Sequence, residues 1–128
     1  MPQRSAPNPE IRRAALAAGW GAERAAVMLL RLKGYRILAR RYLVRGGEID
    51  VVAQRGSTIA FVEVKLRASL DDALISISAE KRRRVSRAAR AFVSRQRATA
   101  LTYRADAIYV APWRWPTHVP AAFELDLG

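Results

Sequence analysis

The chain has 128 residues, 51% of them hydrophobic and none of them cysteine, and this length suffices to bury a core without disulfides. These properties exclude a disulfide-stapled scaffold, a thiolate metal site and a globally disordered chain. The 23 Lys and Arg residues outnumber the 11 Asp and Glu residues, and the resulting charge of +12 favours a polyanion such as nucleic acid as the partner.

Charge and hydropathy also bear on where the protein works. A GC-rich genome would explain why arginine outnumbers lysine, but it would not explain the positive excess. No apolar run approaches the roughly 20 residues that a membrane span needs, and the absence of cysteine fits a reducing compartment. We therefore expect a cytoplasmic protein with no membrane partner, although the Arg-rich, acid-poor N-terminus leaves a mitochondrial presequence as an alternative.

The N-terminal part of the chain is predicted to be a short lead followed by helix. Residues 1–7 are expected to be disordered, and residues 8–128 are expected to form a single domain. Asn8 suits an N-cap because proline follows it in the first helical position. Two glycines in the segment AAGWGAE are expected to interrupt the helical pattern, and a second helix is expected over about 22–33, ended by Gly34.

The rest of the chain reads as strands around one strong helix. Strands are predicted over 35–44, 46–54, 58–67 and 101–112. The loop at 68–78 precedes a helix over about 79–96, whose apolar stripe consists of Val85, Ala88, Ala89, Phe92 and Val93. The tail from about 112 is expected to be irregular. This order, α-β-β-β-α-β, predicts an α/β fold with a mixed central sheet flanked by helices.

Two of the predicted strands form a hairpin that gathers charges. A two-residue type II′ turn at 56–57 would set Asp50 opposite Glu63 and Glu48 opposite Lys65. Because side chains alternate along a strand, all four would share one face, and the other face would carry apolar residues that include Ile49 and Val51. Two carboxylates directly opposite each other repel, so folding alone would not favour this arrangement.

A divalent cation would reverse that repulsion. Mg²⁺ binds one or two protein carboxylates and completes its shell with water and substrate phosphate. A neighbouring lysine, here Lys65, can hold a phosphate or help activate a water. The hairpin thus outlines a site for metal-assisted hydrolysis of phosphodiesters, with Mg²⁺ or Mn²⁺ as cofactor. The competing interpretation is an ordinary solvated strand face on which Glu48 pairs with Lys65.

Glu23 is a further candidate for this site. It leans toward the apolar side of its predicted helix, where a carboxylate needs a partner or a metal. Alternatively, it is a solvent-facing acid in the first turn of the helix, stabilised by the helix dipole.

Several segments together resemble a known family. The stretches GWGAERAAVMLLRLKGYRILARR, GGEIDVVAQ and FVEVKLR closely resemble the YraN family of small bacterial endonuclease-like proteins. The resemblance covers roughly residues 19–123. It implies a restriction-endonuclease-like core of the PD-(D/E)xK nuclease superfamily, which archaeal Holliday junction resolvases share.

The resemblance also implies roles for individual residues. Asp50 and Glu63 match the two metal-binding acids of the motif, and Lys65 matches the motif lysine. Glu23 matches the helical acid that completes the metal site in many resolvase-like members, and the carbonyl of Val64 would be a further ligand. Glu48 belongs to the GEID signature and would support the site, with Lys65 as a candidate partner.

The basic helix predicts a surface for nucleic acid. Outside its apolar stripe it is almost uniformly cationic, with Glu80 as its only acid, whereas a solvated helix face normally interleaves acids. Arginine side chains suit phosphate oxygens and would provide salt-dependent affinity rather than sequence readout. The expected contacts are Lys81, Arg82, Arg83, Arg84, Arg87 and Arg90, extended by Arg41 and Arg67.

These observations lead to one favoured function and two alternatives. We expect a metal-dependent endonuclease acting on DNA, with branched or structured DNA as a candidate substrate and a homodimer as a plausible assembly. The alternatives are a non-catalytic nucleic-acid-binding module on a nuclease fold and an adaptor for an acidic protein. Asp106 is expected to pair with Arg104 or the basic helix, and His118 to have a surface or packing role. Trp113 and Trp115 receive no role.

Overall fold

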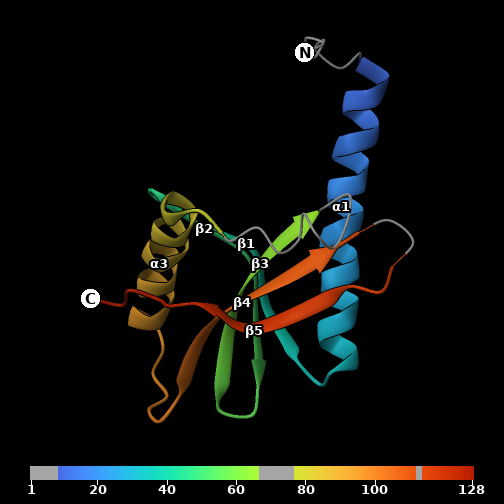
Figure 1. The fold of residues 1–128 in the computed structure, drawn as a ribbon. Helices are drawn as coiled ribbons and strands as arrows, with labels where there is room; N and C mark the ends of the chain where they lie inside the picture. Colours follow the sequence, from blue (N-terminus) through green and yellow to red (C-terminus); the bar gives the residue numbers. More distant parts are fainter. Residues whose placement is uncertain (1–8, 67–76, 112–113) are drawn as a thin grey trace.

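The computed structural model describes residues 9–66, 77–111 and 114–128, and within residues 9–20 it describes the backbone only. Among these residues, two helices pack against one five-stranded sheet (Figure 1). The elements are α1 (Pro9–Leu32), β1 (Arg36–Val44), β2 (Gly47–Arg55), β3 (Thr58–Leu66), α3 (Ala79–Ser94), β4 (Thr102–Val110) and β5 (Thr117–Phe123). The predicted α/β fold with a mixed sheet flanked by helices is confirmed. The expected lead at 1–7, the Asn8 cap and most of the loop at 68–78 lie outside the described residues.

The sheet has the strand order β1-β2-β3-β4-β5. The first three strands form an antiparallel meander, β3 and β4 are parallel, and β4 pairs with β5 in antiparallel fashion. A parallel pair needs a crossover connection, and α3 lies in the connection between β3 and β4.

The two helices cover opposite faces of the sheet. Phe61 of β3 belongs to a buried cluster with Val85 of α3, whereas the neighbouring Val62 belongs to a second cluster with Leu30 of α1. Successive residues of a strand point to opposite faces, so the two clusters are separated by the sheet itself. The predicted apolar stripe of the basic helix is confirmed as the surface that packs on one of these faces.

The first helix is continuous, which contradicts the expected interruption. Gly19 and Gly21 lie inside α1, because a glycine in a helix costs only about 1 kcal/mol and the alanine-, leucine- and arginine-rich flanks offset it. The predicted end at Gly34 is confirmed. Gly34 has a φ of +89°, and Tyr35 N–H donates to the Leu30 carbonyl at 2.9 Å, as in a glycine-ended helix.

The C-terminal segment contains a strand where an irregular tail was expected. Pro120 discouraged a strand prediction, because proline cannot donate to a ladder of hydrogen bonds. β5 is an edge strand, however, and an edge strand tolerates a proline whose missing N–H would face away from the sheet. Prolines at sheet edges are therefore weak evidence against strands.

Close contact between β2 and α3 fixes the helix relative to the hairpin. A Cβ atom on Gly47 would lie 2.6 Å from the Arg84 carbonyl oxygen and 2.8 Å from the Ala88 nitrogen. Only glycine allows the two backbones to approach this closely. The stretch of α3 from Arg84 to Ala88 is thereby held beside the start of β2, where the acidic residues begin.

Candidate metal and nucleic-acid site

As far as the Val51–Val62 pair, the hairpin has the register that the turn predicted, whereas the expected pairs of Asp50 with Glu63 and of Glu48 with Lys65 are not part of the ladder. Ladder pairs run from Arg55–Thr58 to Val51–Val62, and Gly56 has a φ of +60°, as the first central position of a type II′ turn requires. Beyond the last of these pairs, the Val64 N–H donates to Asp50 Oδ2 at 2.8 Å. Asp50 therefore lies beside the end of the ladder, held by the backbone of β3.

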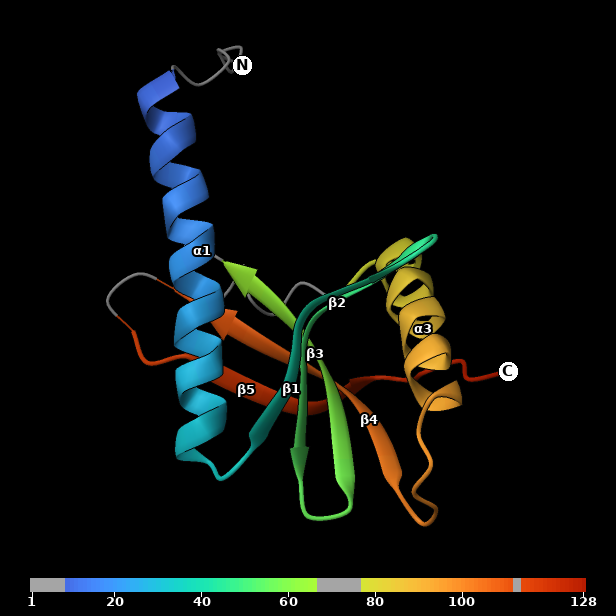
Figure 2. The ribbon, with the colours of Figure 1, turned by 180° about the vertical axis from the view of Figure 1, so that it is seen from behind.

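The alternation of side chains breaks at Asp50. Ile49 and Val52 both pack on the α3 side of the sheet, whereas Val51 packs on the α1 side. The expectation that Ile49 shares a face with Val51 is therefore wrong, since strict alternation fails between positions 49 and 52. Strand β1 has its own irregularity opposite this point, where Arg41 has a φ of +52°. Figure 2 shows that β1 and β2 bend along their length, from beside α1 toward α3.

One half of the site faces α1. Glu23 and Asp50 line an open cavity of about 120 Å³ together with Val64, Ala22 and Leu66. The carboxylate of Glu23 accepts hydrogen bonds from Arg40 Nε at 3.0 Å and Arg41 Nε at 3.2 Å. Glu23 is thus placed beside Asp50, and Arg41 forms an ion pair within the protein.

Glu63 dominates the other half of the site. Its side chain is 2% exposed, and its Oε1 atom lies 3.1 Å from Lys65 Nζ and 3.5 Å from Lys81 Nζ. Its Oε2 atom is buried and has no hydrogen-bond partner among the described residues. Burial and the nearby charge of Asp50 raise the pKa of Glu63 to about 7, and the two lysines only partly oppose this rise.

Glu48 bonds to a lysine that the sequence pattern did not indicate. Its Oε1 atom lies 2.6 Å from Lys81 Nζ and 3.6 Å from Arg84, and the hydrogen bond from Lys81 lowers the pKa of Glu48. The expected pair of Glu48 with Lys65 is wrong, since Lys65 bonds to Glu63 instead. The bend of β2 and the close packing of α3 bring Lys81 into the place expected for Lys65.

The donor atoms fit a hard cation in part. The unpaired oxygen of buried Glu63, with Asp50 close enough to raise its pKa, is the kind of oxygen ligand that Mg²⁺ and Mn²⁺ prefer. Within the described residues, no three side chains of His, Cys, Asp or Glu converge closely enough to form a metal-binding group. Glu23 is directed to its arginines, so a cation at this site would be held chiefly through Asp50 and Glu63.

The exposed face of α3 is basic, but its residues differ in what they contact. Arg82 donates to the Ile77 carbonyl at 3.0 Å, and Arg90 lies 3.7 Å from a carboxylate oxygen of Asp126. Arg83 and Arg87 are exposed and form no hydrogen bond or ion pair within the described part of the chain. Of the two residues expected to extend this surface, Arg41 pairs with Glu23, and Arg67 lies outside the described residues.

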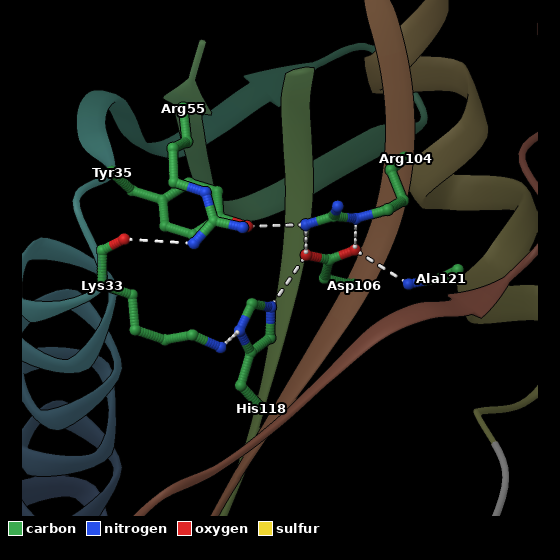
Figure 3. Close-up of polar contacts among 7 residues, drawn as sticks. All are labelled: Lys33, Tyr35, Arg55, Arg104, Asp106, His118 and Ala121. Carbon is green, nitrogen blue, oxygen red and sulfur yellow. Dashed lines mark hydrogen bonds and ion pairs between the residues drawn. The ribbon is translucent and has the colours of Figure 1, made fainter. Parts of the chain in front are cut away.

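The remaining buried acid belongs to a separate network, drawn in Figure 3. Asp106 receives two 2.7 Å hydrogen bonds from Arg104, one of 2.8 Å involving His118 Nε2, and one of 3.0 Å from Ala121 N–H. Arg104 also bonds to the Tyr35 hydroxyl at 2.7 Å. The expected pairing of Asp106 with Arg104 is therefore confirmed.

The same network explains the single histidine. The His118 side chain is 3% exposed, and Figure 3 shows its other ring nitrogen meeting Lys33 at the end of α1. His118 thus has the packing role expected of it, joining β5 to β4 and α1. Trp115 is 69% exposed, and Trp113 lies outside the described residues.

Fold and site together define the class of the protein. A mixed sheet with a helix on each face, and carboxylates and lysines gathered at the end of its central hairpin, is an α/β architecture consistent with a nuclease-like core. The profile of the family described as "Uncharacterised protein family UPF0102" matches residues 22–110, and the chain belongs to this family. The resemblance to the YraN family is thereby confirmed.

Relatives match along most of their length. A UPF0102 protein of Methylocella silvestris is 61% identical over 118 residues, which cover 91% of this chain and 95% of the relative. A UPF0102 protein of Methylorubrum extorquens is 58% identical, with 90% of this chain and 91% of the relative covered. The UPF0102 protein R00337 of Rhizobium meliloti is 48% identical, with 85% and 90% covered. Within the described residues, no helix is both long and apolar enough to cross a membrane.

Proposed function

We propose that the protein is a nucleic-acid-binding endonuclease that hydrolyses phosphodiester bonds of DNA with Mg²⁺ or Mn²⁺, and that branched or structured DNA is its candidate substrate. The observation that carries this proposal is the buried carboxylate of Glu63, whose Oε2 atom has no hydrogen-bond partner in the described part of the chain while Asp50 stands beside it. A buried polar atom without a partner destabilises a fold by about 1–3 kcal/mol, and a second carboxylate nearby adds repulsion. A bound cation would remove both penalties.

The residues around Glu63 have complementary roles in this proposal. Asp50, Glu63 and the Val64 carbonyl would hold the ion, and Glu23 would keep Arg40 and Arg41 beside them. The ion supplies Lewis-acid stabilisation of the phosphate and lowers the pKa of its bound water. Lys65, whose Nζ lies 3.1 Å from Glu63, would orient the attacking water or hold a non-bridging phosphate oxygen.

The basic face of α3 would bind the substrate backbone. Exposed Arg83 and Arg87 are available for phosphate oxygens, and both lie on the helix that brings Lys81 to the acids. Contacts of this kind position the duplex without reading its sequence. Cleavage of both strands of a junction would suit a homodimer, which analytical ultracentrifugation would detect.

Cleavage assays test the proposal directly. Linear, nicked, flapped and four-way DNA, and RNA of matched sequence, are incubated with Mg²⁺ or Mn²⁺ and then separated on denaturing gels. Wild type should cleave at least one DNA, and Asp50→Asn and Asp50→Ala should not. Asp126→Asn, which removes an exposed carboxylate at the other end of α3, should cleave at least as well as wild type does. Equal background cleavage by wild type and the Asp50 variants would refute the proposal.

A non-catalytic nucleic-acid-binding module is the second candidate. It is favoured by the cations that already neutralise the acids, since Lys65 and Lys81 bond to Glu63 and two arginines bond to Glu23. Salt-sensitive binding of DNA without metal-dependent cleavage in the same assays would establish this function instead.

A further inference from the structure

Lys81 lies among the acids as a cation supplied by the protein itself. Its Nζ atom is 2.6 Å from Glu48 Oε1 and 3.5 Å from Glu63 Oε1, and its side chain is only 17% exposed. A lysine in the first turn of a basic helix would ordinarily extend into solvent. Here the approach of α3 to Gly47 directs it inward, where its positive charge faces the carboxylates.

We propose that Lys81 is an internal counter-ion that keeps the affinity of the acidic site for divalent cations low until nucleic acid binds to α3. This inference rests on the proposed function and describes the regulation of the same site. A divalent ion and the Lys81 ammonium both interact favourably with Glu63 and repel each other. In the free protein, the lysine therefore weakens metal binding, because its positive charge neutralises part of the negative charge of the carboxylates.

Bound nucleic acid would change that balance through the same helix. Lys81 is followed along α3 by Arg83 and Arg87, which are exposed and form no ion pair within the described residues. A phosphate held by these arginines offers the lysine a second anion at the rim of the site. The longer of its two contacts, the one to Glu63, is the weaker of the two and is released first.

The movement required is small. The backbone of α3 is fixed against β2 at Gly47, so the helix need not shift. The lysine side chain alone, with its flexible four-carbon stem, can turn from Glu63 toward a phosphate. Lys81 is accordingly a positioning residue, and nucleic acid and metal become ligands that strengthen each other's binding. Thermodynamic linkage requires the two effects to be equal in size.

Metal and DNA affinities of matched variants test the inference. Mn²⁺ affinity of the free protein is measured by calorimetry at about pH 8, above the pKa of Glu63. DNA affinity is measured by fluorescence anisotropy with and without Mn²⁺, and gels verify that the labelled duplex stays intact. The variants are Lys81→Met, Lys81→Arg and Arg83→Met. The last removes one positive charge from α3 at a residue that forms no ion pair with Glu48 or Glu63. Thermal unfolding confirms that each variant is folded.

Substitutions of Lys81 and of Arg83 should have different effects on the two affinities. Lys81→Met should bind Mn²⁺ about tenfold more tightly than wild type, because one opposing charge is gone. In wild type, Mn²⁺ should tighten DNA binding by about fivefold or more, and in Lys81→Met this coupling should nearly vanish. Lys81→Arg, which keeps the charge, should resemble wild type. Arg83→Met should weaken DNA binding while leaving Mn²⁺ affinity unchanged.

Two different failures would be recognisable. If Lys81→Met binds Mn²⁺ no more tightly than wild type, or keeps the full coupling to DNA, the inference about Lys81 is wrong while the proposed metal site stands. If neither wild type nor Lys81→Met binds Mn²⁺ with or without DNA, the proposed metal site itself is refuted, and the inference falls with it.

Discussion

At the scale of single residues, Glu63 shows how the site departs from what folding alone would select. It is buried next to Asp50, and two lysines only partly compensate for this environment. A carboxyl group whose pKa is raised in the folded protein binds its proton more tightly there than in the unfolded chain. Its contribution to stability is therefore greatest at low pH and is lost as pH rises from its unfolded pKa, 4.5, toward 7.

Glu63→Gln should consequently stabilise the protein at high pH. The glutamine keeps the shape of a protonated glutamic acid but never ionises. In the absence of divalent ions, we expect the variant to exceed wild type in free energy of unfolding by about 1–3 kcal/mol near pH 8. The advantage should disappear near pH 4. Urea denaturation at both pH values measures it, and an identical difference at the two would contradict the raised pKa.

Divalent ions should narrow that difference. Mg²⁺ or Mn²⁺ bound by wild type at about pH 8 should raise its melting temperature by a few degrees, because a ligand that binds only the folded state stabilises it. Asp50→Asn and Glu63→Gln should show no such rise. Differential scanning fluorimetry provides the measurement, with Asp126→Asn as the carboxylate control. A rise of the same size in all variants would indicate binding elsewhere on the protein.

At the scale of elements, the contact of β2 with α3 makes one glycine indispensable and leaves another dispensable. A methyl group on Gly47 would meet backbone atoms of α3 at 2.6 Å, whereas a methyl group on Gly21, in the middle of α1, would meet nothing within 4 Å. The two positions therefore respond in opposite directions to the same substitution.

Gly47→Ala should destabilise the protein by about 2 kcal/mol or more, because the helix must move away from β2. Gly21→Ala should stabilise it by about 0.5–1 kcal/mol, since alanine has the higher helix propensity. Chemical denaturation of both variants provides the test. If Gly47→Ala were neutral, α3 would not be held against the hairpin as described.

The segment after β5 places acids over the basic helix. Glu124 and Asp126 line a cavity of about 200 Å³ with five residues of α3, and Asp126 N–H donates to Ser86 Oγ at 3.0 Å. These carboxylates lie on the face of α3 that we propose binds nucleic acid. They should therefore oppose the binding of DNA to this face.

Neutralising these acids should tighten DNA binding. Glu124→Gln with Asp126→Asn should increase affinity several-fold at low salt, measured by anisotropy across a salt series. A control that raises the net charge equally, Ser57→Lys with Thr117→Lys, adds its cations at exposed positions on other elements. Equal effects of the two double variants would mean that net charge alone, rather than the position of the acids, sets affinity.

At the scale of the whole molecule, the Asp106 network joins the end of α1 to β4 and β5. Although burial alone would raise the pKa of Asp106, its hydrogen bonds to His118, Arg104 and Ala121 outweigh that effect and lower it. A depressed carboxyl pKa contributes stability above the unfolded value of 3.8 that is lost as pH falls below it. The network therefore stabilises the folded protein at neutral pH, and this stabilisation decreases in acid.

Removing the charge of Asp106 should lower the free energy of unfolding. Asp106→Asn leaves the half-buried Arg104 without its counter-ion, and we expect a loss of about 2–3 kcal/mol at pH 7, below that for a fully buried pair because water still reaches the guanidinium. The loss should shrink in acid, where wild type is itself protonated. Asp126→Asn should change stability by less than about 0.5 kcal/mol. Urea titrations of the three proteins decide the matter, and a neutral Asp106→Asn would show that the network is not a stabilising one.

Local patterns predicted most of this structure, and long-range packing produced the rest. The glycine-serine turn fixed the register of the hairpin, because turn geometry and alternation are both local. The break at Asp50 and the arrival of Lys81 were not predictable, since they depend on how β2 bends and on a helix 33 residues away in sequence from Glu48. Strand β5 was missed because Pro120 opposes strands locally, while the exposed edge of the sheet removes the objection.

The Asp106 network is completed only late in biosynthesis. Translation proceeds from the N-terminus, so α1 and β4 leave the ribosome before β5 does. Until His118 and Ala121 emerge, Asp106 has only Arg104 among the partners that finally surround it. A nascent chain that ends before β5 therefore carries a half-satisfied charge at the centre of the molecule, and we expect stalled products of this length to be degraded rather than to accumulate.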